Sequence, residues 1–304
     1  MRVVIAGGSG FIGEPLVRRL LAAGNDVAVL TRNPSNIGSG RALTWNPPSP
    51  GTWVDDAANS DVVINLAGEN VGGGRWTEAR KARILNSRVA ATTALVSAMA
   101  RNPNGQRTLI NASAIGFYGD RGNEPLDEDS PAGTGFLSEV TKRWEELALT
   151  AEPIARVVIL RLGVVLAVDG GALAKLLLPF RLGAGGPMGS GRQWMSWIDR
   201  EDVLRMIEWS IGHDTVRGIY NATAPTPATN RDFAKALGRA LHRPAMLPTP
   251  AFALRLALGS GMADEMLLGG QRVLPMRATD ERFEFAYPEL DASLAHAISG
   301  RNYR

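Results

Sequence analysis

Two patterns of hydrophobic positions alternate from the amino terminus to about residue 222. Short apolar runs predict buried strands, and between them lie longer stretches with helical spacing of apolar residues. The predicted strands are 3–6, 26–30, 42–45, 62–66, 108–112, 157–162 and 218–221. The predicted helices are 14–23, 77–101, 138–150, 172–180, 200–211 and 231–241. Strands that alternate with helices are typical of right-handed βαβ units, so the pattern predicts an α/β fold with a doubly wound parallel sheet.

The pattern changes after residue 243. Prolines 244, 248 and 250 indicate a linker, and apolar stretches at 252–258 and 263–268 predict two helices. A short closing strand is expected after these helices. We therefore expect a large domain over 1–243, with insertions around 164–198 that shape the substrate side, and a small C-terminal domain over 244–304.

The first strand leads directly into a glycine-rich turn. Residues 3–13 read VVIAGGSGFIG, with glycines at 7, 10 and 13, and a helix-compatible apolar run follows. A strand that turns into a helix N-terminus in this way presents backbone N–H groups and the positive end of the helix dipole to a pyrophosphate. The alternative is an ordinary glycine-rich βα turn without a ligand.

The end of the second strand bears on the choice of nucleotide. An acidic residue about 20 positions beyond the glycines would accept the ribose hydroxyl of NAD. Arg32 stands there instead, 32 − 13 = 19 positions after Gly13. A guanidinium suits a 2′-phosphate, so the sequence favours NADP(H). Alternatively, Arg32 is a solvent-exposed loop residue and leaves the preference open.

Composition excludes several other classes of site. The 304 residues include no cysteine and only three scattered histidines, so we expect no thiolate chemistry and no metal centre. The formal charge of +3 is unclustered and does not indicate nucleic-acid binding. Long apolar runs and signal-peptide features are lacking, so we expect a cytoplasmic protein without a membrane segment.

Several segments together resemble one protein family. The spacing G-x-x-G-x-x-G resembles the extended short-chain dehydrogenase/reductase superfamily. VINLAGENV, GGGRWTEARKARILNSR, SAIGFYG, TKRWE and GSGRQWMSWIDRED resemble its atypical branch, the "epimerase family", which carries a C-terminal domain of unknown function. The resemblance covers essentially the whole chain, and residues 282–288 resemble the family's closing strand and proline turn. It implies a Rossmann-type sheet with a small C-terminal substrate lobe and a nicotinamide cofactor.

The resemblance also carries over cofactor residues. Gly7, Gly10 and Gly13 would be the phosphate-loop glycines, and Ser9, Phe11 and Ile12 would lie along the pyrophosphate. At the end of the fourth strand, four residues would line the cofactor site: Asn65, Leu66, Ala67 and Gly68.

The catalytic part of the pattern departs from the superfamily. Ser113 fits the serine that hydrogen-bonds the reacting oxygen, or simply ends a strand. In typical members a Tyr-x-x-x-Lys pair follows, but here Lys142 is preceded by Ser138 at the tyrosine position. A serine hydroxyl is a far weaker acid than a phenol of pKa about 10. Tyr118 supplies the acid, or a water does, or the redox step is lost, while Lys142 would hold the ribose.

Four large side chains are candidates for the substrate side. Arg75 would hold an anion and Trp76 would wall a pocket, unless this stretch only begins a helix with Thr77 as N-cap. Trp194 and Trp197 follow a glycine-rich stretch. Because they are three residues apart they would face opposite sides of a strand, so at most one reaches the pocket and core packing is expected for the other.

These features favour an NADP(H)-dependent oxidoreductase or epimerase that acts on a small carbonyl or alcohol substrate, with nucleotide sugars as the superfamily's usual class. The alternative is a non-catalytic NADPH sensor or scaffold, which the serine at position 138 favours. The long helix predicted at 77–101 could also mediate a homodimer, as in relatives.

Overall fold

A seven-stranded parallel sheet forms the centre of the computed structural model, which describes residues 1–103 and 107–299. The strand order is β11-β7-β5-β4-β1-β2-β3. The strands are β1 (Arg2–Ala6), β2 (Asp26–Thr31), β3 (Arg41–Thr44), β4 (Val62–Asn65), β5 (Thr108–Ala114), β7 (Arg156–Leu162) and β11 (Gly218–Ala222). Each predicted strand is confirmed to within two residues at either end. Strand order reverses between β1 and β4, which is where such sheets bind ligands.

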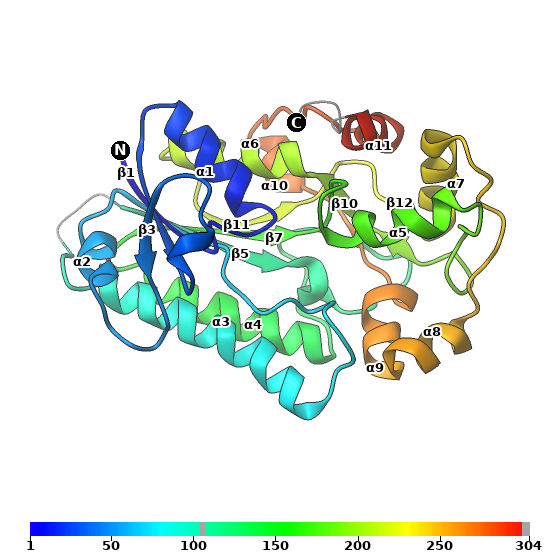
Figure 1. Ribbon diagram of the computed structural model, residues 1–304, viewed down its shortest axis with the longest axis horizontal. Coiled ribbons are helices and arrows are strands. Elements are labelled where there is room, and N and C mark those ends of the chain that lie inside the picture. Colours follow the sequence, from blue (N-terminus) through cyan, green and yellow to red (C-terminus); the bar gives the residue numbers. More distant parts are fainter. Residues whose placement is uncertain (104–106, 300–304) are drawn as a thin grey trace.

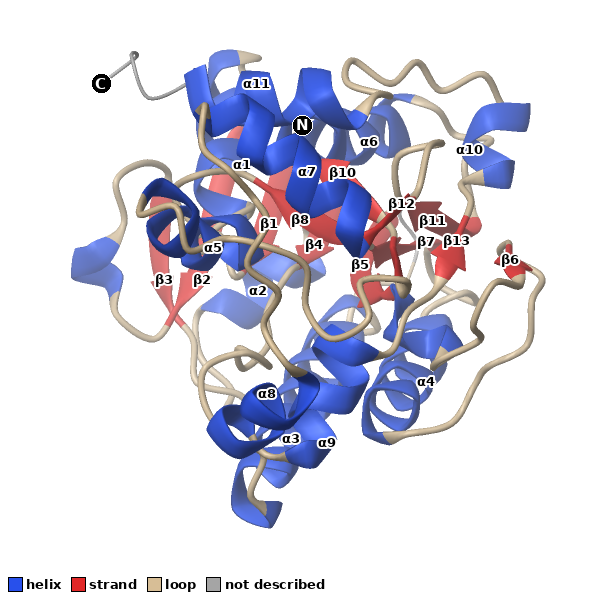
Figure 2. Cartoon of the chain, turned by 90° about the vertical axis from the view of Figure 1, so that its right-hand side faces the viewer, coloured by secondary structure: helices blue, strands red, loops and turns tan. Residues whose placement is uncertain are grey.

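Helices cover both faces of this sheet, as Figures 1 and 2 show. Alternate residues of β1 enter different cores: Val3 and Ile5 pack on one face, Val4 and Ala6 on the other. The first face lies under α1 (Gly13–Ala22) and α6 (Arg200–Gly212). The second lies against α2 (Trp53–Ala58), α3 (Glu78–Met99) and α4 (Phe136–Leu149). The doubly wound fold is therefore confirmed.

Additional elements extend beyond the carboxyl ends of the strands, on the right of Figure 1. Two short strand pairs lie there: β8 (Val164–Leu166) with β10 (Trp197–Asp199), and β9 (Trp194–Met195) with β12 (Ala228–Thr229). A separate apolar core joins three helices to them: α5 (Gly171–Arg181), α7 (Asn230–Leu241) and α11 (Leu290–Ser299).

The remaining C-terminal elements are short. They are α8 (Ala251–Leu258), α9 (Ser260–Ala263), β13 (Arg272–Val273), which pairs with β6 (Pro125–Leu126), and α10 (Met276–Asp280). The helix predicted at 263–268 is instead α9 followed by a π-helical turn over Asp264–Leu268. The closing strand predicted around 282–288 is wrong, because this segment is a loop. The division at residue 243 stays a prediction.

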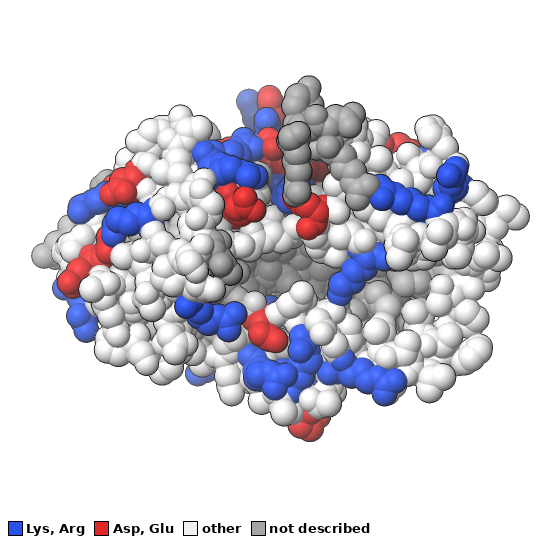
Figure 3. Space-filling view, in the orientation of Figure 1, with Lys and Arg blue, Asp and Glu red and all other residues white. Residues whose placement is uncertain are grey.

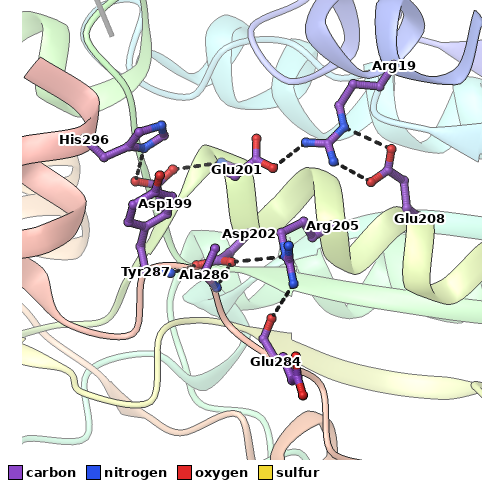
Figure 4. Close-up of polar contacts among 10 residues, drawn as sticks. All are labelled: Arg19, Asp199, Glu201, Asp202, Arg205, Glu208, Glu284, Ala286, Tyr287 and His296. Carbon is purple, nitrogen blue, oxygen red and sulfur yellow. Dashed lines mark hydrogen bonds and ion pairs between the residues drawn. The ribbon is translucent and has the colours of Figure 1, made fainter. Parts of the chain in front are cut away.

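Side chains of α6 hold that loop, as Figure 4 shows. The buried Asp202 carboxylate accepts the backbone N–H groups of Ala286 (2.7 Å) and Tyr287 (3.0 Å). Asp199 caps α6, and its Oδ2 lies 3.0 Å from Nδ1 of His296 on α11. The loop therefore bonds through its backbone to a helix rather than to a neighbouring strand. Within the described residues, no helix is both long and apolar enough to cross a membrane.

Candidate functional site

The glycine-rich turn forms a tightly packed backbone cradle at the switch point. Gly7 has a φ of +81°, and a Cβ added to it would lie 2.9 Å from the Leu66 carbonyl oxygen. A Cβ on Gly13 would lie only 2.2 Å from the Gly7 oxygen. Gly10 donates its N–H to that same oxygen at 3.0 Å. Side chains are excluded here, so the backbone of the turn can approach a ligand closely.

Helix α1 begins at the edge of this cradle. Its N-cap residue, Ile12, makes no side-chain capping hydrogen bond, and the neighbouring Ser9 and Gly10 are exposed. A helix N-terminus without a side-chain cap is suited to an anionic group. The turn is exposed, and its glycines stand where an added Cβ would clash with the backbone. Both features fit the pyrophosphate of a dinucleotide.

Phe11 lies differently from the other residues of the turn. Its ring packs on the backbone of Gly170 and Gly171, where an added Cβ would come within 2.3 Å and 3.2 Å of ring atoms. The Arg200 guanidinium lies over the ring, 5.0 Å from its centroid, and is paired with Asp169 at 2.7 Å. Phe11 therefore anchors the turn to the insertion that follows β7.

Arg32 is exposed and immediately follows Thr31, the last residue of β2. The chain then enters a short 3₁₀ turn over Pro34–Asn36. This is the position from which a residue can reach the ribose of a nucleotide held by the cradle. The structure thus gives the guanidinium the open position that phosphate recognition needs.

The end of β4 joins the cradle to the next strand and helix. The buried Asn65 amide donates to Thr92 Oγ1 (3.0 Å) and to Asn111 Oδ1 (2.7 Å), and its oxygen accepts the Ala67 N–H (3.2 Å). Asn65 therefore shapes the strand end rather than presenting its side chain to the crevice. The half-buried Leu66 and Ala67 follow directly after the strand.

Arg88, a residue that no sequence motif singled out, lies beside Gly68. A Cβ on Gly68 would be 2.9 Å from Arg88 Cζ, so the glycine makes room for the guanidinium. Arg88 stacks 4.9 Å from the ring centroid of Trp144 on α4. Burial lowers the pKa of Arg88 to about 10. The segment LNSR in the middle of a predicted helix gave no sign of this position.

At the end of β5, the predicted catalytic serine is part of a buried network. Ser113 Oγ donates to Glu145 Oε1 at 2.5 Å. The same carboxylate pairs with Arg161 through two bonds of 2.9 and 2.8 Å. Ser113, Glu145 and Arg161 are each at most 4% exposed. An arginine inside the apolar run VVILRL was the sequence signal for this buried pair.

Tyr118 belongs to the same network. Its hydroxyl donates to Asn221 Oδ1 (2.7 Å) and accepts from Arg161 Nη1 (2.8 Å). The side chain is 0% exposed, and burial raises the pKa of Tyr118 to about 12. A proton donor must reach the substrate oxygen, directly or through one water. This placement therefore does not support Tyr118 as the acid.

The predicted pair on α4 consists of a buried serine and an exposed lysine. Ser138 Oγ donates to the carbonyls of Phe117 and Gly133, both at 2.9 Å, and the side chain is buried. Lys142 is exposed. It is two residues, or about 200° around the helix, from Trp144, which faces Arg88 on α3. Lys142 therefore points away from α3, a direction that does not support a role in holding the ribose.

Arg75 and Trp76 lie in the loop between β4 and α3. Arg75 donates to the backbone carbonyls of Ala257 (3.0 Å) and Leu256 at the end of α8. Trp76 packs edge-on against Phe136 and donates to the Val71 carbonyl at 2.9 Å. The bonds of Arg75 go to protein carbonyls, so this structure does not support anion binding there. Thr77 is the N-cap of α3, as the alternative interpretation expected.

The two later tryptophans differ in burial. Trp197 is fully buried and donates to the Thr226 carbonyl at 3.0 Å, so it packs in the core as expected for one of the pair. Trp194 is half-buried; Arg272 stacks on its ring at 4.9 Å and Asn123 accepts its indole N–H at 2.8 Å. Among residues 1–103 and 107–299, no group of three or more His, Asp or Glu side chains could hold a metal ion.

Comparisons with known proteins agree with this arrangement. A family model described as the NAD dependent epimerase/dehydratase family matches residues 3–223, and a domain of unknown function, DUF1731, matches 249–297. An epimerase family protein of Mycobacterium leprae is 40% identical over 301 residues, covering 98% of this chain and 95% of that protein. These matches confirm the resemblance found in the sequence.

Two solved structures are similar over nearly all of this chain. The human epimerase family protein SDR39U1, solved with NADPH, has a TM-score of 0.87 at 35% identity and covers 98% of this chain and 99% of its own. A nucleoside-diphosphate sugar epimerase from Corynebacterium glutamicum has a TM-score of 0.77 at 32% identity. That match covers 97% of this chain and 57% of the other.

Proposed function

This chain belongs to the NAD dependent epimerase/dehydratase family, and we propose that it is an NADP(H)-dependent oxidoreductase or epimerase acting on a small carbonyl or alcohol. The observation that carries the proposal is the glycine cradle, which excludes side chains where a pyrophosphate would lie. The exposed Arg32 supports a 2′-phosphate, as does the relative solved with NADPH. When bound, the nicotinamide would exchange a hydride with the substrate.

The cofactor half of the proposal assigns roles to the chain's own groups. The backbone around Gly7, Gly10 and Gly13 would hold the pyrophosphate against the N-terminus of α1. Arg32 would bind the 2′-phosphate through its planar guanidinium. Leu66 and Ala67 would form the floor beneath the nucleotide. Ser113, Tyr118 and Lys142 receive no proton-transfer role, because the first two are buried in a network and Lys142 is exposed and points away from α3.

A second candidate function is an NADPH sensor or scaffold without turnover. One observation favours it: the hydroxyls of Ser113, Tyr118 and Ser138 are all bonded within the protein. Such a protein would bind the cofactor through the same cradle and change a partner surface with occupancy. The homodimer through α3, the cytoplasmic location and a nucleotide-sugar substrate stay predictions under either function.

Cofactor preference is the first test. We would measure the dissociation constants of NADPH and NADH for the wild-type protein and for Arg32→Asp. We expect tighter NADPH binding by the wild type and a shift of at least tenfold toward NADH in the variant. Arg217→Asp, an exposed arginine beside β11, is the matched charge control. An unchanged preference in Arg32→Asp would show that Arg32 does not read the phosphate.

Turnover separates the two functions. NADPH oxidation would be followed by absorbance against panels of aldehydes, ketones, quinones and keto-sugars, with product analysis for redox-neutral epimerisation. Turnover of any substrate class supports the enzyme. Tight NADPH binding without turnover or epimerisation supports the sensor. Lys142→Met should leave both cofactor affinity and turnover unchanged, because Lys142 is exposed and points away from α3.

A further inference from the structure

Arg88 lies on α3 at the level where the strands of the sheet end. One turn further along the helix, Thr92 is bonded to the Asn65 amide at the end of β4, which fixes the height of α3 against the sheet. The Arg88 guanidinium occupies the space that a side chain at position 68 would fill. It therefore lies directly against the loop that borders the crevice.

The guanidinium is fixed from one side only. Its Nη1 donates to the carbonyls of Glu69 (3.1 Å) and Ile84 (3.0 Å), and the Trp144 ring supports its plane. Within 1–103 and 107–299, its Nε and Nη2 make no hydrogen bond. Two neutral carbonyls and an aromatic ring thus orient a cation whose other N–H groups remain available.

The charge of Arg88 is not matched by a carboxylate. No Asp or Glu oxygen of the described residues lies within 4.0 Å of it. Glu69 is the acid that acts on it electrostatically, yet that carboxylate is 3.6 Å from Arg80 Nη2. Arg88 is half-buried, and removing a cation even in part from water without a paired anion is costly. Figure 3 shows Lys and Arg side chains along the lower edge and right side of a hollow in one face of the molecule, with acidic side chains also at its edges.

We propose that Arg88 binds an anionic group, a phosphate or a carboxylate, of the ligand that occupies this crevice. Its fixed plane and available N–H groups suit two parallel bonds to such an oxyanion. The proposal depends on the proposed function in one respect, since both require that the crevice binds a ligand. The anion belongs either to the cofactor or to the substrate, and the experiment distinguishes these sources.

The test compares Arg88→Met, which keeps an apolar stem on Trp144, with Arg83→Met, an exposed arginine on the same helix. Calorimetric titrations of the full chain would use inorganic pyrophosphate and succinate as probes, with and without saturating NADPH. NADPH affinity would be measured separately by fluorescence. We expect Arg88→Met to weaken binding of at least one probe tenfold or more, and Arg83→Met to change it less than twofold.

The pattern of losses identifies the source of the anion. A tenfold weaker affinity for NADPH, with pyrophosphate displaced by the cofactor, assigns the anion to the cofactor. An unchanged NADPH affinity, with succinate binding to the NADPH-loaded protein lost, assigns it to the substrate. Probe and NADPH affinities that both equal those of the wild type would overturn the proposal and leave Arg88 as a clamp between α3 and α4.

Arg88→Lys guards against a folding defect, because it keeps the charge but removes the planar fork. We expect this variant to bind the probe with intermediate affinity. Wild-type affinity for the probe in a folded Arg88→Lys would contradict recognition by the fork. If no form of the protein binds NADPH, the proposed function fails, while dependence of probe binding on Arg88 would still be measured.

Discussion

The two ends of the crevice are built on opposite principles. At the β1–α1 end the backbone is bare: glycines exclude side chains, and the helix N-terminus has no side-chain cap. At the β5–α4 end, side chains of Ser113, Glu145, Arg161 and Tyr118 form a closed network whose members bond to one another. The first end is thus shaped to receive a ligand, whereas the hydrogen-bonding groups of the second stabilise the protein itself.

Replacing Arg161 with Met should have the largest effect. The change leaves the Glu145 carboxylate buried without its partner, which costs about 3–5 kcal/mol of unfolding free energy. Denaturant unfolding would measure it. Arg143→Met, which removes an exposed pair with Glu146 on the same helix, should cost less than about 1 kcal/mol. Similar costs for both variants would contradict a closed, stabilising network.

Gly13→Ala tests the β1–α1 end of the crevice. Its Cβ would come within 2.2 Å of the Gly7 oxygen, so the turn must shift, at about 1–3 kcal/mol. We expect NADPH affinity to fall much more than stability, because the displaced turn is the cradle. Fluorescence titration would measure NADPH affinity, and denaturant unfolding would measure stability. The control variant is Gly212→Ala, whose Cβ meets no atom within 4 Å. Wild-type NADPH affinity in Gly13→Ala would show that the cradle holds no cofactor.

Tyr118→Phe distinguishes a stabilising role of this tyrosine from a catalytic one. The variant loses the hydroxyl that joins Asn221 to Arg161, which should cost about 1–3 kcal/mol of unfolding free energy. NADPH affinity, and any turnover found, should be unchanged. A catalytic tyrosine would give the reverse result: near-normal stability and lost turnover, in the same two measurements.

Glu128→Gln should have the smallest effect, which is a change in how the free energy of unfolding depends on pH. Glu128 accepts the Asn221 N–H at 2.9 Å, and burial raises its pKa above the ordinary 4.5. The folded state therefore holds the proton more tightly, so this group's contribution to stability is present below pH 4.5 and is lost as pH rises through the folded-state pKa. Unfolding followed across pH should show a shallower fall in Glu128→Gln. Glu146→Gln, at an exposed site, should keep the wild-type slope.

The sequence predicted the seven strands and the cradle because both depend on backbone properties. Apolar runs fit a doubly covered sheet, and glycine spacing reflects the close approach of Gly13 to Gly7. Side-chain direction was harder to predict. Ser113 shares a face of β5 with the buried Leu109 and Asn111, whereas Ala114, on the opposite face, is partly exposed. Arg88 was missed because its position depends on a glycine twenty residues earlier.

The loop 70–76 illustrates a way in which this fold can change its ligand. Arg75 binds carbonyls of α8, Arg80 binds the Asn70 carbonyl, and Lys175 of α5 binds the Gly72 carbonyl at 2.6 Å. All of these acceptors are main-chain oxygens, which every amino acid provides. Side chains of α8, and those of the loop other than Arg75, can therefore be exchanged during evolution while the hydrogen bonds between the loop and α8 persist. The loop and α8 can therefore change the chemistry of their side chains without changing their position relative to each other.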